Sequence, residues 1–327
     1  MKTYYQNGIV EDVHYFIDKT DEFQIQELDN ETQNRFTYPE DSINYALDGE
    51  ICVLYDTLRD MIFDDIDQYY QELSILPIWV QEAGQNSDCV ISVDTFNEWI
   101  SESNIPNLYK HLYLVDCQFL VGTIQNLLCA MEDAFVRYYK TIAISDKEEK
   151  YQDLTNPNGT IFVLSESSTR ASAMIETYFT KAYSILDIIC KICYEIQFKY
   201  EDFSVHKKLK SADILWGSRK KLLINGTPNN LFEKCDFISK IEALRNEIVH
   251  NGTWELNPKK FIRFENGLVK ERFMLFPDMI QGHLSTSKSR RHFFSSRIKV
   301  NDILPCIHLE FKKRFLKTIE IMNCREL

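Results

Sequence analysis

One stretch of the sequence combines side chains that suit chemistry at a phosphate. Arg245, Asn246 and His250 lie within six residues, directly before Asn251 and Gly252. On a helix, residues four apart share a face, so Asn246 lies beside His250, and the long side chain of Arg245 begins about 100° away. Gly252 is typical of the residue that follows a helix, which predicts that His250 lies in the last turn. A permanent cation beside a group that exchanges a proton favours phosphodiester chemistry.

The elements that must position this stretch are expected to be helices. Glycine and proline are scarce, at 10 and 8 of 327 residues, and apolar residues recur at three- and four-residue steps over long runs. The expected fold class is therefore mainly α. A hairpin is predicted around the turn pair Asn266-Gly267, and residues 1–40 are expected to be irregular with a short strand or two. Helices are predicted at about residues 42–73, 95–101, 107–141, 168–200, 230–251 and 301–323.

Charge is distributed unevenly along the chain. Residues 1–150 carry 29 acidic and 9 basic side chains, whereas residues 151–327 carry 28 basic and 20 acidic ones. The polar, turn-rich residues 145–160 fall where the charge changes sign, which predicts an acidic, mostly helical region over 1–150 and a second domain over 160–327. The basic half suits a phosphate-bearing partner. The acidic half is either a cover for that basic domain or simply a soluble surface.

Several function classes are excluded by what the sequence lacks. It has no glycine-rich phosphate loop, no GxSxG elbow and no HExxH pair, and its seven histidines show no ligand spacing, so neither a metal nor a cofactor is expected. Cys190 and Cys193 have CxxC spacing inside an apolar helix, which favours buried structural thiols. Without a run of 18 apolar residues or a signal-peptide pattern, the chain is expected to be cytoplasmic, with reduced cysteines and no membrane contact.

The chain resembles the HEPN superfamily, the higher eukaryote and prokaryote nucleotide-binding helical domains. Leu244-Arg245-Asn246-Glu247-Ile248-Val249-His250-Asn251-Gly252 follows the hallmark of that family, an arginine, a polar residue often asparagine, a few residues and then histidine. The upstream run Tyr183–Lys191 resembles the first core helix of several such families. The resemblance covers about residues 165–325. It implies a HEPN-like helical bundle, from which the basic, hairpin-bearing insertion at about 253–300 departs.

The resemblance also implies a function. Many HEPN proteins are metal-independent endoribonucleases, often toxins or phage-defence effectors, in which a homodimer brings two motifs into one cleft. His250 would then act as general base or acid, Arg245 would stabilise charge on the phosphorane, and Asn246 would bind the phosphate or orient His250. The expected partners are RNA or a nucleotide, a second copy, and a protein inhibitor or antitoxin. Two alternatives stay open: a non-catalytic dimerisation, nucleotide-binding or RNA-binding module, or a chance match in which His250 caps the helix.

Four further residues are candidates for supporting roles. Asp187 and Lys191 are four apart on the upstream helix, so they either face the motif helix and position Arg245 or form an exposed pair. Glu176 is a candidate for the acidic residue that some HEPN proteins carry on that helix, and Glu247 could pair locally with Arg245.

Two basic segments with interleaved aromatics could contact single-stranded RNA, whose bases stack on rings. The alternative is a solvated surface with the aromatics in the core. The candidate RNA-binding cations are Lys207, Lys208, Arg219, Lys220, Arg290 and Arg291.

Overall fold

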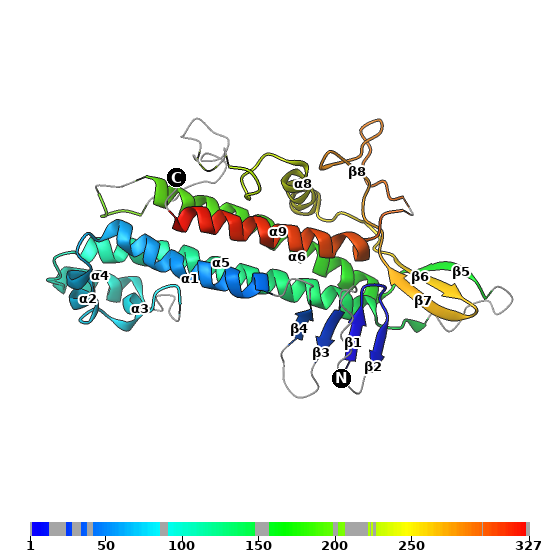
Figure 1. The fold of residues 1–327 in the computed structure, drawn as a ribbon, viewed down its shortest axis with the longest axis horizontal. Coiled ribbons are helices and arrows are strands. Elements are labelled where there is room, and N and C mark those ends of the chain that lie inside the picture. The colour runs from blue at the N-terminus through cyan, green and yellow to red at the C-terminus, as the bar shows by residue number, and fades with distance from the viewer. Residues whose placement is uncertain are drawn as a thin grey trace. The chain divides into compact units, whose positions relative to one another are not determined.

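The structure is a computed structural model, and the expectation of a mainly α protein is confirmed (Figure 1). The helices are α1 (Ser42–Ile62), α2 (Ile66–Leu73), α3 (Ile78–Gln81), α4 (Val93–Glu102), α5 (Leu108–Ile142), α6 (Glu166–Gln197), α8 (Asp236–Asn251) and α9 (Val300–Asn323). The structure describes residues 2–12, 24–27, 34–37, 42–85, 91–147, 157–198, 202–206, 222, 224, 227–295 and 297–324.

Among the described residues, the strands form three small antiparallel sheets (Figure 1). The predicted hairpin is present, and both of its turn residues, Asn266 and Gly267, have positive φ (53° and 76°), as a type I′ turn requires. The first forty residues hold more strand than expected. In sheet order, the strands are β2 (Val10–Asp12), β1 (Lys2–Tyr5), β3 (Gln24–Glu27) and β4 (Asn34–Thr37); then β5 (Gly159–Val163), β6 (Lys260–Glu265) and β7 (Leu268–Phe273); then β8 (Met279–Ile280) and β9 (His283–Leu284).

Contacts divide the chain into two compact units, each assembled from three separate stretches. Unit 1 comprises Met1–Tyr45, Cys129–Tyr183 and Lys234–Lys313, and unit 2 comprises Ala46–Leu128, Ser184–Glu233 and Arg314–Leu327. The boundary expected at residues 145–160 therefore does not separate them, because the residues on both sides of it belong to unit 1. The change of charge along the sequence is not a division of the fold, since each of the long helices contributes residues to both units.

In unit 1, the buried side chain of Asn301 joins several elements. Its Oδ1 accepts a hydrogen bond from Tyr138 Oη at 2.6 Å, and its Nδ2 donates to the carbonyls of Gln6 at 2.7 Å and Arg272 at 3.0 Å. Its own carbonyl accepts from Tyr139 Oη at 2.9 Å. Because buried polar groups must be paired, this network fixes the start of α9 against α5 and the strands.

Unit 1 also contains a buried polar cluster on α5, α6 and α9. His308 is fully buried, stacks on Phe135 with ring centroids 4.4 Å apart, and lies 3.2 Å from Tyr178 Oη through Nδ1. Lys312, also fully buried, forms an ion pair with Glu132. Burial, reinforced by the charge of Lys312, holds the pKa of His308 well below its ordinary value, so the imidazole is neutral in the folded protein.

Residues 42–73 were expected to form a single helix, but they form two, α1 and α2. Asp65 explains the break, because its backbone is extended and its side chain caps the second helix by accepting from Gln68 N at 2.9 Å. In α4, the side chain of Ser92 provides the cap by accepting from Thr95 N at 3.1 Å. The apolar spacing located these helices, whereas the side-chain caps set their ends.

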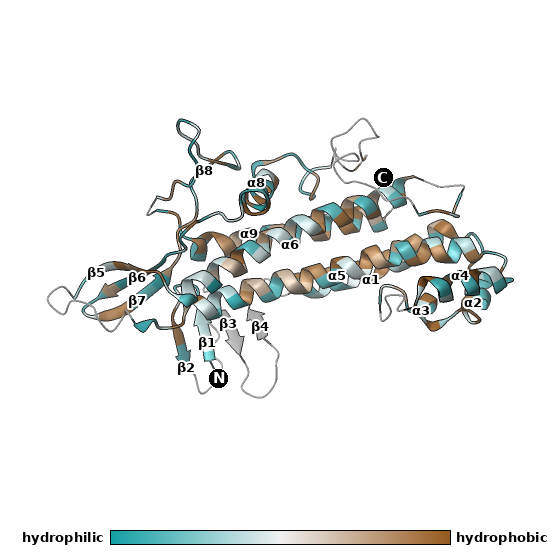
Figure 2. Ribbon diagram, turned by 180° about the vertical axis from the view of Figure 1, so that it is seen from behind, coloured by the Kyte–Doolittle hydropathy of each residue, from teal (hydrophilic) through white to brown (hydrophobic). Residues whose placement is uncertain are grey.

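One helix in the described part of the chain, α5, is long and apolar enough to cross a membrane, judged by length and composition alone. Its 18-residue window has a mean hydropathy of 1.4, and 39% of that window is buried within the protein. Figure 2 shows the helix coloured by the hydropathy of its residues. The core helix of a soluble protein has the same character, so this property is weak evidence of a membrane span.

Candidate functional site

The predicted chemistry lies on α8, whose shape follows from its sequence. Ile238, Ile241 and Leu244 recur at three-residue steps and are buried, so they fix one face of the helix in unit 1. Gly252 ends the helix with φ 87° and donates its N–H to the carbonyl of Ile248, as expected of a glycine in this position. The helix begins at Asp236 rather than at about residue 230.

The structure places the three predicted catalytic residues on two sides of α8. The guanidinium of Arg245 lies over the ring of Tyr183, 4.7 Å from its centroid, and its Nη1 donates to Asn246 Oδ1 at 2.9 Å. His250 is exposed in the last turn, as expected. Asn246 and His250 line the same cavity. The sequence therefore correctly placed Asn246 beside His250, while Arg245 contacts α6.

The cavity that holds Asn246 and His250 has a volume of about 520 Å³. One wall is a single face of α8, and the other is the segment that contains β8 and β9. This size falls within the range of about 300–1,000 Å³ that small-molecule sites occupy. The lining residues are Ala243, Asn246, Glu247, His250, Asn251, His283, Leu284, Thr286 and Arg291.

A buried carboxylate lies at the wall of this cavity. The side chain of Glu247 is 4% exposed, and its Oε2 accepts from Arg291 Nη1 at 2.9 Å. Its Oε1 lies 3.0 Å from His292 Nε2, and His292 Nδ1 lies 2.8 Å from the carbonyl of Trp254. Glu247 thus binds Arg291 and His292 instead of forming the predicted local pair with Arg245, because residues two apart on a helix do not face each other.

The segment that supplies Arg291 and His292, residues 277–295, is here named the strap. Its β8–β9 turn has positive φ at Gln281 (50°) and Gly282 (77°). At Gly282 the backbone passes so close to α8 that a Cβ would lie 2.4 Å from the carbonyl oxygen of Asp236. The strap is therefore attached to the first turn of α8 at Gly282 and to its later turns through Glu247.

Among the predicted supporting residues, Glu176 contacts the segment that directly follows α8. Its Oε1 accepts from Thr253 Oγ1 at 2.6 Å, directly after α8, and the neighbouring Trp254 donates from Nε1 to Ser172 Oγ at 3.1 Å. Both contacts fasten the end of α8 to α6 within unit 1. Asp187 and Lys191 are half-buried and belong to unit 2, so their role in positioning Arg245 stays a prediction.

The predicted RNA-binding cations have different outcomes. Arg291 lines the cavity, and Arg290, next to it, is exposed on the strap. Sequence reasoning missed His283, which lines the cavity from β9; the Gln281-Gly282 pair before it was the available turn signal. The other predicted cations, Lys207, Lys208, Arg219 and Lys220, lie outside the described residues.

Within the described ranges, no group of three or more histidine, cysteine or acidic side chains could hold a metal ion. Cys190 and Cys193 are buried free thiols, and burial raises the pKa of Cys193 to about 12. Thiols in such surroundings are poor nucleophiles and poor metal ligands, which agrees with a structural role for the CxxC spacing.

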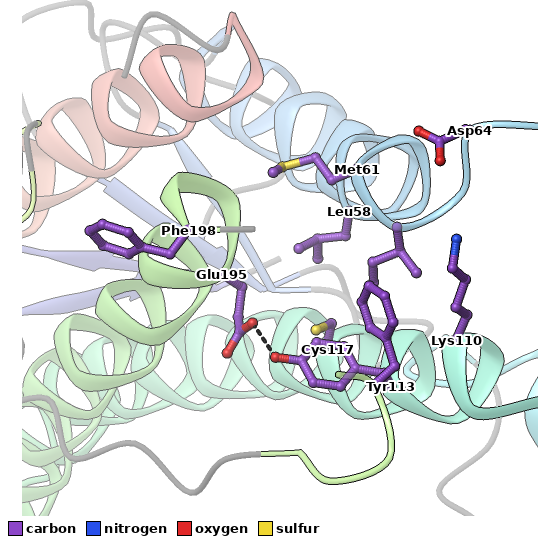
Figure 3. A pocket seen from close by; sticks show the side chains of 10 residues that line it. Leu58, Met61, Asp64, Lys110, Tyr113, Cys117, Glu195 and Phe198 are labelled. Carbon is purple, nitrogen blue, oxygen red and sulfur yellow. Dashed lines mark hydrogen bonds between the residues drawn. The ribbon is translucent and has the colours of Figure 1, made fainter. Parts of the chain in front are cut away.

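A second, smaller cavity of about 150 Å³ lies in unit 2 (Figure 3). Tyr113 Oη donates to the buried carboxylate of Glu195 at 2.6 Å on its wall (Figure 3). Nearby, burial raises the pKa of Asp116 and lowers that of His206, and each charge counteracts the effect on the other. These polar residues in an aromatic surrounding were not identified from the sequence, because Tyr113 and Asp116 on α5 are about 80 to 90 residues from Glu195 and His206.

No protein-family model matches the chain, and no curated protein or solved structure matches it significantly.

Proposed function

We propose that the protein is a metal-independent endoribonuclease of the HEPN type, using Arg245 and His250 of two subunits. The observation that carries the proposal is the cavity in which His250 and Asn246 lie beside the cation Arg291. An exposed imidazole next to an amide and a guanidinium is a set of groups that can bind a phosphate and exchange a proton at it.

RNA supplies its own nucleophile, so the proposed reaction requires no metal. His250 removes the proton from a ribose 2′-hydroxyl, and the 2′-oxygen forms a bond to the adjacent phosphorus. The bond from phosphorus to the 5′-oxygen breaks, and that oxygen leaves with a proton returned by an imidazolium. The products carry a 2′,3′-cyclic phosphate and a 5′-hydroxyl. Arg245 stabilises the phosphorane, and Asn246 binds the phosphate or orients His250.

In this proposal a second copy completes the site. Arg245 and His250 are five residues apart, which is about 140° around a helix, so one α8 cannot direct both at the same phosphate. A homodimer that brings two α8 helices together would place Arg245 of one copy near His250 of the other. A toxin or phage-defence role in the cytoplasm, restrained by an antitoxin or by the acidic residues 1–150, belongs to the same proposal.

A specific observation favours the alternative of a non-catalytic RNA-binding or nucleotide-binding module. The carboxylate of Glu247 lies at the cavity wall, and the guanidinium of Arg245 is already engaged by Tyr183 and Asn246. A site with this arrangement can retain a phosphate through Arg291 without stabilising a phosphorane.

The two functions are distinguished by incubating purified protein with labelled single-stranded RNA in the presence of EDTA. Wild type, His250→Ala, Arg245→Ala and the surface control Arg170→Ala are compared after folding is checked by circular dichroism. Cleavage that leaves 2′,3′-cyclic phosphate ends, and that is lost in the first two variants only, supports the nuclease. If the protein binds the RNA but neither the wild type nor any variant cleaves it, the result supports the non-catalytic module and contradicts catalysis.

A further inference from the structure

The strap supplies an arginine to the cavity, whereas the residues of α8 that line it include no arginine or lysine. Arg291 lines the cavity together with His250, although the two residues come from segments about forty positions apart in the sequence. Its side chain is 51% exposed, so it borders both the buried carboxylate of Glu247 and the open side of the cavity.

Arg291 retains hydrogen-bonding capacity toward a ligand. A guanidinium carries five N–H donors in a planar fork. One nitrogen, Nη1, donates to Glu247 Oε2 at 2.9 Å. The geometry of the fork allows the remaining donors to bind a phosphate while this bond persists, and paired donors to phosphate are among the strongest hydrogen bonds in proteins.

The surroundings of Glu247 are built to hold this arginine. A buried carboxylate without partners is costly, and Glu247 has two, Arg291 and His292. Both ring nitrogens of His292 face oxygen atoms, one of the Glu247 carboxylate and one of the Trp254 carbonyl, so these contacts fix the ring between α8 and the residues that follow it.

The backbone that presents Arg291 is itself fixed. Gly282 lies against the first turn of α8, while Trp254, which accepts from His292, donates to Ser172 on α6. Arg245, in contrast, is held by contacts with Tyr183 and Asn246. Within a single chain, Arg291 is therefore the arginine whose position suits a ligand in the cavity.

We propose that Arg291 is the phosphate-binding residue of this cavity, and that Glu247 and His292 are positioning residues that fix it there. The inference rests on the proposed function for its substrate class, a short stretch of single-stranded RNA. Arg291 binds the RNA through a backbone phosphate, and His250 acts on a ribose beside it. The strap is then half of the site, and each chain captures its own RNA.

The test separates binding from cleavage. Binding is measured by fluorescence anisotropy with a labelled single-stranded oligonucleotide whose 2′-oxygens are methylated and which therefore cannot be cleaved. The proteins are wild type, Arg291→Ala, Arg291→Lys and Arg170→Ala, an exposed arginine of unit 1 that pairs with Glu166. We expect Arg291→Ala to raise Kd about tenfold or more, Arg291→Lys to restore part of the affinity, and Arg170→Ala to bind like wild type.

Salt dependence tests whether the lost contact is to a phosphate. Removing one phosphate contact lowers the slope of log Kd against log salt concentration by about 0.7 for a single strand. We expect that decrease for Arg291→Ala. On cleavable RNA, Arg291→Ala should raise KM and leave kcat within about threefold, whereas His250→Ala should abolish kcat.

The outcomes distinguish this inference from the proposed function. Arg291-dependent binding without cleavage supports the inference and overturns the nuclease. Cleavage that depends on His250, with Kd, KM and salt slope unchanged in Arg291→Ala, supports the nuclease and overturns the inference. If wild type does not bind the oligonucleotide at all, both are overturned.

Discussion

Replacing Glu247 with alanine should release the strap from α8. The substitution removes two contacts, the 2.9 Å bond from Arg291 and the 3.0 Å contact with His292. Hydrogen bonds to charged groups contribute about 1.5–3 kcal/mol each when both partners are buried. Arg291 and His292 are 51% and 36% exposed and regain water when released, so we discount the total to about 2 kcal/mol.

This free energy should appear as local opening of the strap. A loss of about 2 kcal/mol raises the open fraction about thirtyfold, because each 1.4 kcal/mol is a factor of ten. Lys288 and Arg290 are exposed cleavage sites for trypsin on the strap. Under native conditions, when opening is fast relative to cleavage, the rate at these two sites should rise by the same factor. Cleavage is followed by mass spectrometry of the fragments.

Two further variants make the test specific. Glu247→Gln keeps the shape and one acceptor but removes the charge, so its strap should be cleaved at a rate between those of wild type and Glu247→Ala. Glu242→Ala, on the same helix, is the matched control and should resemble wild type. Equal cleavage of the strap in Glu247→Ala and wild type would refute the reasoning, since it would mean that this carboxylate does not hold the segment.

Two more predictions concern stability. Gly282→Ala should destabilise the protein by about 1–3 kcal/mol and loosen the strap, because φ is 77° and the added Cβ would lie 2.4 Å from the Asp236 carbonyl; thermal unfolding and hydrogen exchange of the strap measure both effects, and unchanged exchange would contradict this packing. The depressed pKa of His308 means that the unfolded chain binds a proton that the folded chain excludes, so this stabilisation is present above pH 6.5 and is lost as the pH falls below it, by up to about 1.4 kcal/mol per pH unit. Urea midpoints between pH 7.5 and pH 5 should fall less steeply in His308→Gln, and identical slopes would count against a neutral buried imidazole.

The sequence predicted the elements that local rules determine. The period of the apolar residues located α5, α6, α8 and α9, and the Asn266-Gly267 pair located the hairpin, because helix faces and tight turns depend on residues near each other in the chain. The position of His250 in the last turn followed in the same way from Gly252.

Long-range pairing could not be predicted. Nothing in the sequence near Glu247 indicates that its partners are Arg291 and His292, more than forty residues further on. The strand β5 escaped notice for the same reason, since it pairs with β6 about a hundred residues away. The charge pattern did not predict the two units either, because each unit is assembled from three stretches that are far apart in the sequence.

The geometry of α8 explains why the motif residues need the strap. Arg245 and His250 lie about 140° apart on α8, whereas Asn246 and His250 share the face that lines the cavity. That face needs a cation from elsewhere if it is to hold a phosphate. The strap brings Arg291 to it in the same chain, and a second copy could bring Arg245. Because Glu247 lies on the cavity face of α8, its carboxylate would repel a phosphate if it were unpaired. Paired with Arg291 and His292, the same carboxylate instead fixes the arginine that a phosphate would bind.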